Sequence, residues 1–277
     1  MKKILTLVLA VLMIAGCVVS FASCGKKSDW ETIEEKGKFV CGITIYEPMN
    51  YYDTDGKTLI GFDTELAQAV AAKLGVTVEF QVIDWGSKYT ELSSYNIDCI
   101  WNGFTSNSKD DDGIERSDKV DFSYAYLDNA QCVIVKSDKA ASITSAESLK
   151  GLKGAAETGS AGETYAKSVT DADKVFGKTS QMDTFLELKS GAVDFIVVDV
   201  LLADKIVGQG DYADLVKATA VTIDTEVYSI GCRKDSDFDD KINEALIELL
   251  NEGKIEELAT KYDVHITQSL MDKKTAK

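Results

Sequence analysis

The sequence predicts an α/β protein composed of two lobes. Short runs of β-branched residues alternate with amphipathic helical stretches, a pattern typical of mostly parallel sheets flanked by helices. Strand-like segments of similar character occur at residues 130–136 and again at 227–234, which indicates that the chain crosses between the lobes twice, through two hinge strands. The chain contains a single proline, Pro48, and no low-complexity linker, so strands rather than a flexible connection are expected to join the lobes.

The first lobe is expected to begin with residues 38–130. Asp63 or Thr64 can cap a helix that ends at Gly75, and a turn at residues 53–56 precedes this helix. The predicted strands of this lobe are residues 38–45, 76–82 and 97–101. The apolar residues of the helix fall on one face, which is expected to pack on the sheet.

The second lobe is expected to comprise residues 131–222. A short strand at 154–157 leads into a glycine-rich turn and then a helix from Glu163 onward, and a buried strand at 191–199 ends on an acidic residue. Residues 223–277 are expected to return to the first lobe. They contain two predicted amphipathic helices, at residues 238–251 and 254–262.

The N-terminus is typical of a secretory signal. Two lysines precede an apolar stretch, and small residues follow it, so residues 1–23 are interpreted as a signal peptide and 24–37 as a tether. The segments around Cys24 and Cys17 both resemble bacterial lipoprotein cleavage sites. Cys24 is favoured for lipid attachment because polar residues follow it. These features predict a lipoprotein anchored to the outer face of the cell membrane, with an ordinary signal peptide and an incidental cysteine as the alternative.

Charge and composition exclude several classes of function. The formal net charge is -16, which is the wrong sign for a nucleic-acid-binding surface. His265 is the only histidine, so Cys/His zinc sites and histidine-dependent nucleophilic catalysis have almost no residues to draw on. No metal and no cofactor are therefore expected. The remaining cysteines lie in apolar strand-like runs: Cys41, Cys99, Cys132 and Cys232. Free thiols are favoured at these positions. Disulfides are possible in an exported protein, but the sequence does not show which cysteines would pair.

Five short motifs in a fixed order carry a resemblance to a known family. They are Gly61-Phe62-Asp63-Thr64-Glu65-Leu66, Asp98-Cys99-Ile100-Trp101-Asn102-Gly103-Phe104-Thr105, Glu115-Arg116-Ser117-Asp118-Lys119-Val120-Asp121-Phe122-Ser123, Gly159-Ser160-Ala161-Gly162-Glu163 and Val193-Asp194-Phe195-Ile196-Val197-Val198-Asp199. Together they make residues 38–263 resemble the solute-binding proteins of amino-acid ABC importers. The resemblance implies a type II periplasmic-binding-protein-like fold, a monomer that binds a free amino acid, and an ABC transporter permease as its partner.

The resemblance assigns the two charged ends of the ligand to different lobes. Arg116 aligns with the arginine that binds the ligand carboxylate, for which its planar fork is suited. Asp199 aligns with the aspartate that binds the ammonium. The turn formed by Gly159, Ser160, Ala161 and Gly162 aligns with a second carboxylate contact, made through backbone N–H groups at a helix N-terminus. The alternatives are a surface arginine for Arg116 and a helix cap for Asp199.

The resemblance also places two aromatic residues, Tyr46 and Trp85, around the ligand side chain, with membership of the core as the alternative. Thr105 aligns with a hydroxyl that binds polar atoms of the ligand, or is simply part of a strand. Asn102 and Gly103 precede it at the same strand end and are further candidates for ligand binding.

Two departures from the family pattern affect the prediction. Thr44 stands near the position where relatives have an acid, which weakens a lysine or arginine specificity. Several extra residues lie in the 106–114 segment before Arg116, and they are interpreted as a solvated acidic loop rather than a calcium site because alternate oxygen spacing is lacking.

The predicted function is therefore a non-enzymatic receptor that closes on an amino acid. The ligand is left open among polar uncharged, aromatic and cationic amino acids and cystine. The alternative is a cyclohexadienyl dehydratase, which acts on prephenate or arogenate, has the same fold and needs a general acid, for which Glu157 or Glu163 is available.

Overall fold

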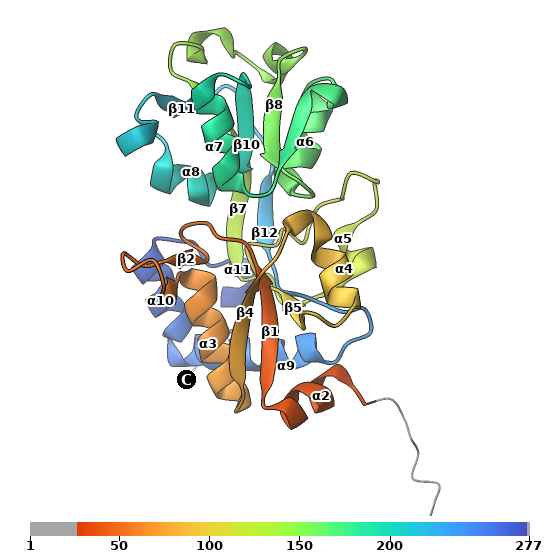
Figure 1. The fold of residues 1–277 in the computed structure, drawn as a ribbon. Helices are drawn as coiled ribbons and strands as arrows, with labels where there is room; N and C mark the ends of the chain where they lie inside the picture. The colour runs from red at the N-terminus through yellow and green to blue at the C-terminus, as the bar shows by residue number, and fades with distance from the viewer. Residues whose placement is uncertain (1–26, 276–277) are drawn as a thin grey trace, which may run out of the picture.

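Two lobes joined by two adjacent strands make up the computed structural model, which describes residues 27–275 (Figure 1). Strands β7 (Leu127–Lys136) and β12 (Thr225–Tyr228) run antiparallel between the lobes. Residues 127–130 of β7 pair with β12, whereas residues 131–135 pair with β10 of the second lobe. The change of partner between Ala130 and Gln131 marks where the chain passes from one lobe to the other. The predicted signal peptide and both candidate lipidation sites, Cys17 and Cys24, lie outside the described residues.

The sheet of the first lobe has the strand order β4-β1-β5-β13-β6. Its strands are β1 (Lys38–Ile43), β4 (Thr77–Val82), β5 (Cys99–Ile100), β6 (Asp121–Phe122) and β13 (Gly231–Cys232). The pairs β1–β4 and β1–β5 are parallel, whereas β13 runs antiparallel to both of its neighbours. A short hairpin of β2 (Tyr51–Tyr52) and β3 (Leu59–Ile60) lies beside this sheet.

Helices cover both faces of the first sheet. Helix α3 (Phe62–Leu74) packs against α9 (Phe238–Glu252) and α10 (Lys254–Tyr262), and their apolar faces form one core with alternate residues of β1. A 3-10 turn, η1 (Trp85–Ser87), and helix α4 (Lys88–Ser93) bound a second core on the other face. Two further short helices complete this lobe: α5 (Arg116–Lys119) and α11 (Gln268–Met271).

The second lobe repeats this architecture. Its sheet has the order β11-β7-β10-β8-β9, with β8 (Gly154–Glu157), β9 (Val175–Lys178), β10 (Phe195–Asp199) and β11 (Leu215–Lys217). Helix α6 (Ala161–Val169) covers one face, and α7 (Gln181–Ser190) and α8 (Val200–Ile206) cover the other. Four 3-10 turns connect these elements: Ala140–Ser142, Ala146–Leu149, Ala172–Lys174 and Gly210–Tyr212.

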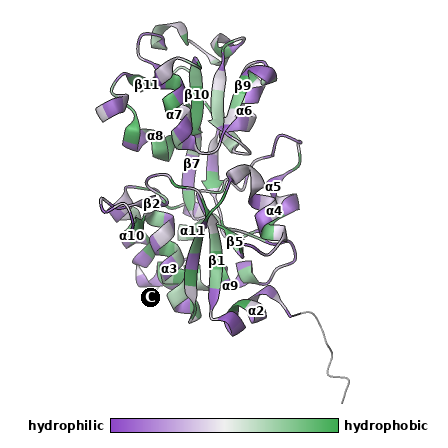
Figure 2. Ribbon diagram, in the orientation of Figure 1, coloured by the Kyte–Doolittle hydropathy of each residue, from purple (hydrophilic) through white to green (hydrophobic). Residues whose placement is uncertain are grey.

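Hydropathy follows this layered arrangement. Figure 2 shows hydrophobic residues concentrated along the central strands and hydrophilic residues on the outer helices. Along β10, successive residues such as Val197 and Val198 contribute to the cores on opposite faces of the sheet. Within residues 27–275, no helix is both long and apolar enough to cross a membrane.

The fold class is the predicted one, but three details differ. Both sheets are mixed rather than mostly parallel. In the first sheet β13 runs antiparallel to its neighbours, and in the second sheet β7, which passes between the lobes, runs antiparallel to its neighbours. Helix α3 begins at Phe62 after Gly61, so neither Asp63 nor Thr64 caps it. The carboxylate of Asp63 is buried instead and accepts a hydrogen bond from the backbone of Gly103 at 2.8 Å. Strand β10 starts at Phe195, later than the predicted residue 191, because Gly191 ends α7 in a left-handed conformation.

The expected tether at residues 24–37 is partly a packed helix. Helix α2 (Asp29–Lys36) begins with a capping box between Ser28 and Glu31. Ile33 is 1% exposed and belongs to the core of the first lobe. The backbone N–H of Trp30 donates to Asp237 at 2.8 Å, and its ring stacks on Phe238. Apolar burial and capping therefore hold α2 on the first lobe. The segment is short and mostly polar, so its sequence did not predict this helix.

Replacing Ile33 with alanine tests whether α2 is part of the fold. We expect the free energy of unfolding in urea to fall by about 2–5 kcal/mol, because the substitution leaves a cavity in a closed core. The exposed neighbour Glu34 provides a matched control, and Glu34→Ala should change stability by less than about 0.5 kcal/mol. Equal, small effects of the two substitutions would mean that the segment is only a tether.

Candidate functional site

Residues from both lobes line a cleft at the ends of their central strands. The lining residues are Trp85, Asn102, Gly103, Thr105 and Arg116 from the first lobe, and Gln131, Glu157, Ser160, Ala161, Gln181 and Asp199 from the second. Strands β8 and β10 end at Glu157 and Asp199, so the carboxyl ends of parallel strands face the cleft, as is general for ligand sites in α/β proteins. The enclosed volume is about 10 Å³, room for one water molecule, so a larger ligand requires the lobes to separate.

Arg116 is held by contacts on three sides. Its side chain is 1% exposed. Its Nε donates to Oδ1 of Asp110 at 2.9 Å, and Nη1 donates to the carbonyl of Thr105 at 3.0 Å. Its Nη2 points across the cleft to the carbonyl oxygen of Gly159 in the second lobe, 3.4 Å away. Since this last contact is long and neutral, Nη2 is the donor available to an anionic ligand. The alternative of a surface arginine does not fit this burial.

The loop at residues 106–114 has a structural role that its sequence did not suggest. Lys119 pairs with Asp110 at 2.9 Å and with Asp112 at 2.7 Å, so these acids are not merely solvated. Asp111 reaches the second lobe, where it accepts a hydrogen bond from Thr164 of α6 at 2.8 Å and pairs with Lys167. The extra residues therefore orient Arg116 and connect the lobes. Among the described residues, no cluster of three or more potential ligands could hold a metal ion.

The glycine-rich turn contributes only part of its length to the cleft. Ser160 and Ala161 line it, whereas Gly159 and Gly162 do not. Gly159 donates its N–H to Glu163 at 2.7 Å, and its carbonyl accepts from Lys88 at 2.8 Å. A Cβ at Gly162 would lie 2.9 Å from the carbonyl oxygen of Val197, so glycine there allows α6 to approach the sheet.

Asp199 lies at the N-cap position of α8, but its side chain makes no cap bond. Its Oδ1 accepts from Asn129 at 2.9 Å and from Gln131, and its Oδ2 accepts from Gln181. The carboxylate is 5% exposed and lines the cleft. The helix-cap alternative is therefore wrong, and three side-chain amides stabilise this buried charge.

A second buried acid, Glu226 of strand β12, shares these amides. Asn129 donates to it at 2.5 Å and Gln131 at 2.7 Å. Burial, reinforced by repulsion from Asp199, raises the pKa of Glu226 to about 7. Burial also raises the pKa of Asp199. The two carboxyls thus meet beside the strands that join the lobes.

The two predicted aromatic residues have different environments. Trp85 lines the cleft, and its ring contacts Phe104 edge to face with centroids 5.4 Å apart. Tyr46 belongs to the core of the first lobe and does not line the cleft. Its hydroxyl lies 1.9 Å from where a Cβ on Gly103 would be, so Tyr46 requires glycine at that position. Asn102 bonds to Thr44 and Asn50, which ties the strand end to the neighbouring loop.

The sequence did not predict four residues at or beside the cleft as ligand contacts: Gln131, Glu157, Gln181 and Lys88. Glu157 ends a strand in the same way as Asp199, a signal that could have identified it. Lys88 is 1% exposed, and its Nζ donates to the carbonyls of Gly159 and Trp85 at 2.8 and 3.3 Å. Burial and the charge of Arg116 lower the pKa of Lys88 to about 7. Lys88 thus contacts the second lobe, as Arg116 and Asp111 do.

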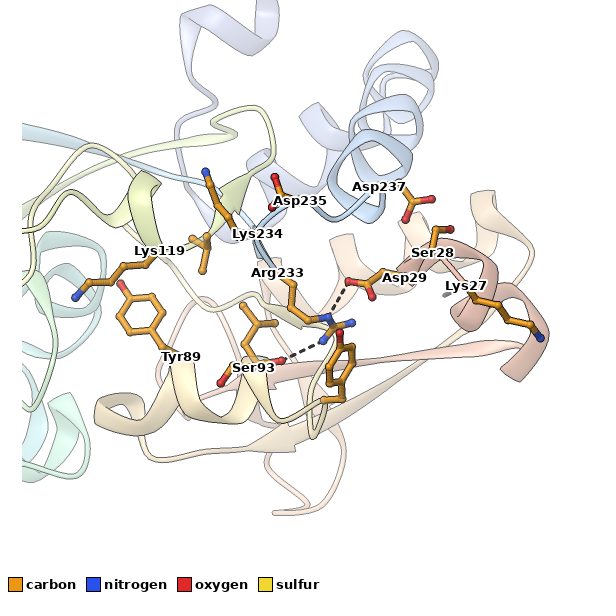
Figure 3. Close-up of a pocket in the computed structure, with 13 residues that line it drawn as sticks. Lys27, Ser28, Asp29, Tyr89, Ser93, Lys119, Arg233, Lys234, Asp235 and Asp237 are labelled. Carbon is orange, nitrogen blue, oxygen red and sulfur yellow. Dashed lines mark hydrogen bonds and ion pairs between the residues drawn. The ribbon is translucent and has the colours of Figure 1, made fainter. Parts of the chain in front are cut away.

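A larger depression of about 630 Å³ lies elsewhere on the first lobe, between α4, the start of α2 and the segment before α9 (Figure 3). Several of its charged residues form ion pairs within the fold. Arg233 binds Asp29 at 2.7 Å and Asp98 at 3.1 Å, and Lys234 binds Asp121 at 2.6 Å. These contacts connect the segment that follows β13 to α2, to the residue before β5 and to β6.

The four cysteines of the described residues are free thiols. Cys41, Cys99 and Cys232 lie side by side on neighbouring strands, and the sulfurs of Cys41 and Cys99 are 3.5 Å apart. Burial raises the pKa of all three thiols. His265 is exposed, away from the cleft.

Comparison with known proteins identifies the family. The family model for bacterial extracellular solute-binding proteins, family 3, matches residues 39–265. The chain belongs to this family. It is 29% identical over 255 residues to the arginine-binding extracellular protein ArtP of Bacillus subtilis, covering 91% of this chain and 96% of ArtP. It is 28% identical over 258 residues to the L-cystine-binding protein TcyJ of Escherichia coli K12, covering 92% of each.

A solved family structure has the same fold. It is an ABC uptake transporter substrate-binding protein from Streptococcus pneumoniae with bound histidine, which superimposes with a TM-score of 0.75 at 29% identity. The match covers 86% of this chain and 97% of that one. The two-lobed type II fold of this family member is therefore established, and its relatives are amino-acid-binding proteins.

The acid pair predicts a pH-dependent stability in the absence of ligand. The folded protein keeps a proton on Glu226 where an unfolded chain, with an ordinary glutamate pKa of 4.5, has lost it. The free energy of unfolding should therefore fall as the pH rises from about 5 to about 7. Glu226→Gln removes the titrating group and keeps an acceptor for the two amides, so the fall should become shallower in urea titrations across this range.

Glu248, which is exposed on α9, supplies the control for this experiment. Glu248→Gln should leave the slope of stability against pH unchanged. A slope that is identical in the wild type and in Glu226→Gln would exclude Glu226 as the titrating group.

Proposed function

We propose that this family member is a substrate-binding lipoprotein that captures a free amino acid between its lobes and delivers it to an ABC transporter permease. The observation that carries the proposal is a single cleft with a buried guanidinium from one lobe and a buried carboxylate from the other. A free amino acid carries the complementary charges at its two ends. The names of ArtP and TcyJ, which bind arginine and cystine, support an amino acid as ligand.

The proposed binding mode uses fixed donors and acceptors. The ligand carboxylate takes the place of the Gly159 carbonyl against Nη2 of Arg116, near the free N–H groups that begin α6. The ligand ammonium lies against the carboxylate of Asp199. The neighbouring side-chain amides hold this carboxylate in position. Thr105 supplies a further polar contact and Trp85 a flat surface for the side chain. No covalent step is required.

Closure follows from contacts that only the closed form provides. A ligand that touches Arg116 and Asp199 at once binds the closed state better than the open one and shifts the population toward it. Strands β7 and β12 join the lobes and are the proposed hinge. The closed form presents one continuous surface of both lobes, which is the form proposed to dock on the permease.

The proposed location is the outer face of the cell membrane. Two acyl chains on Cys24, with Cys17 as the alternative, would hold the protein there. The family description as extracellular supports an extracytoplasmic site. The first described residues, 27 and 28, lead into α2, which packs on the first lobe.

Replacing Arg116 tests the proposed function. Wild-type protein should be stabilised by at least one member of a panel of free amino acids and cystine, by about 2.7 kcal/mol at 100 times its dissociation constant. Arg116→Ala should weaken every such ligand by at least about 30-fold, because it leaves a buried carboxylate without its partner. Arg116→Lys, which keeps the charge but loses the fork, should give a smaller loss. Thermal shift and calorimetric titration measure both.

The folding of each variant is checked by its urea transition, because Arg116 also binds Asp110 and Thr105. Wild-type affinity in a folded Arg116→Ala protein would remove Arg116 from the site. Asp199→Asn provides the corresponding test at the ammonium end. Conversion of prephenate or arogenate, with no amino acid bound, would support the dehydratase alternative instead.

The contact between Asp111 and α6 predicts an effect on closure. Asp111→Ala removes its bonds to Thr164 and Lys167, so the closed state loses up to about 1 kcal/mol, as expected for an exposed pair. We expect a several-fold weaker affinity, expressed as faster ligand dissociation in stopped-flow fluorescence. Asp171→Ala, which breaks a similar pair with Lys174 within the second lobe, should leave dissociation unchanged. Equal rates in the two variants would contradict a role in closure.

A further inference from the structure

We propose that Glu157 binds a positively charged group on the side chain of the ligand, which makes the ligand a basic amino acid. This inference rests on the proposed function and specifies its substrate class. The acid that Thr44 replaces at the first strand is then supplied from the opposite lobe. The threonine at position 44 weakened the prediction of a lysine or arginine specificity. It does not exclude a basic ligand if Glu157 supplies the acid.

The position of Glu157 suits this role. It is the last residue of β8, which pairs with β10, the strand that ends at Asp199. It is 3% exposed and lines the cleft together with Arg116 and Asp199. Its Oε1 has no hydrogen-bond partner among the described residues. A buried carboxylate oxygen without a partner is costly, and a ligand that donates to it removes this cost.

The other buried acids of the second lobe and of strand β12 have hydrogen-bond partners: Asp199, Glu163 and Glu226. Three side-chain amides donate to Asp199. Glu163 accepts from the N–H of Gly159 at 2.7 Å and pairs with Lys167 at 3.0 Å. Glu226 accepts from two of the amides that also serve Asp199. Of the two acids that line the cleft, Glu157 is thus the one with an unused acceptor.

Among the described residues, no cation of the protein forms an ion pair with Glu157. Lys88 directs its Nζ to the carbonyls of Trp85 and Gly159, and no ion pair between Lys88 and Glu157 occurs in the described structure. Arg116 is bound to Asp110 and faces the proposed ligand carboxylate. Burial, then repulsion from Asp199, raises the pKa of Glu157 well above its ordinary value, and the attraction of Lys88 offsets only part of this rise.

The charges that line the cleft favour the same ligand class. Arg116 is positive, whereas Glu157 and Asp199 are both acids. A zwitterionic amino acid with a neutral side chain adds no net charge and leaves one acid unbalanced. A basic amino acid adds one positive charge, so each charged group of the ligand meets an opposite charge in the cleft.

Arginine and citrulline separate this inference from simple shape recognition. They have nearly the same size, but the side chain of citrulline is uncharged. Calorimetric titration of the full chain should show that L-arginine binds at least about tenfold more tightly than L-citrulline, because a hydrogen bond to a charged group is worth more than one to a neutral group. Glu157→Gln should reduce this ratio to about one by weakening L-arginine, with L-citrulline changed by less than about threefold.

Glu147→Gln is the matched control. Glu147 is an exposed acid of the second lobe outside the cleft, so its substitution makes the same change in total charge. It should preserve the ratio of the two affinities. A wild-type protein that binds L-citrulline as tightly as L-arginine, or a Glu157→Gln protein that weakens both ligands equally, would overturn the inference. Binding of cystine without any basic amino acid would overturn it as well.

These failures differ from failure of the proposed function. If neutral amino acids bind in an Arg116-dependent manner and basic ones do not, the receptor function stands and the role of Glu157 is wrong. If no amino acid binds, the proposed function itself is wrong. L-lysine and L-ornithine extend the test, since both should also lose affinity in Glu157→Gln while L-glutamine should not.

Discussion

The Arg116 guanidinium imposes the main constraint on this structure, because a buried positive charge must be held by fixed acceptors and, for the proposed function, must also be accessible to a ligand. Asp110 and the Thr105 carbonyl satisfy the inner face of the group, and only Nη2 is directed across the cleft. The loop at residues 106–114 holds the guanidinium in this position through Asp110. The same loop carries Asp111 to the second lobe, so positioning of the charge and contact between the lobes depend on one segment.

Two acids, Asp199 and Glu226, are buried next to the strands that join the lobes. Asn129 and Gln131 on strand β7 donate to Asp199, and both also donate to Glu226 on strand β12. Two of the three amides at the proposed ammonium site therefore lie on β7, one of the two strands that join the lobes. Under the proposed function, a ligand charge placed here would act next to the proposed hinge strands, which would give binding and closure a common physical basis.

Much of the fold and part of the site could be predicted because they depend on local pattern. The helices at residues 238–252 and 254–262 follow from amphipathic periodicity and from Gly253 between them. The prediction failed where tertiary contacts override local preference. Asp63 is a reasonable helix cap by type, yet it is buried and bound to Gly103. Residues 29–36 look like a polar tether, yet Ile33 fixes them to the core.

By itself the sequence determined the two-lobed α/β class, the family motifs and the presence of one suitable arginine and one suitable acid, since each depends on residue type and order along the chain. Only the tertiary structure decided which residues meet. In the structure Tyr46 does not line the cleft, whereas Gln131, Gln181 and Glu157 do. Which residues line the cleft depends on where strands from distant segments end. The physical reason is that the cleft lies between two separately folded sheets, and no local pattern records the distance between them.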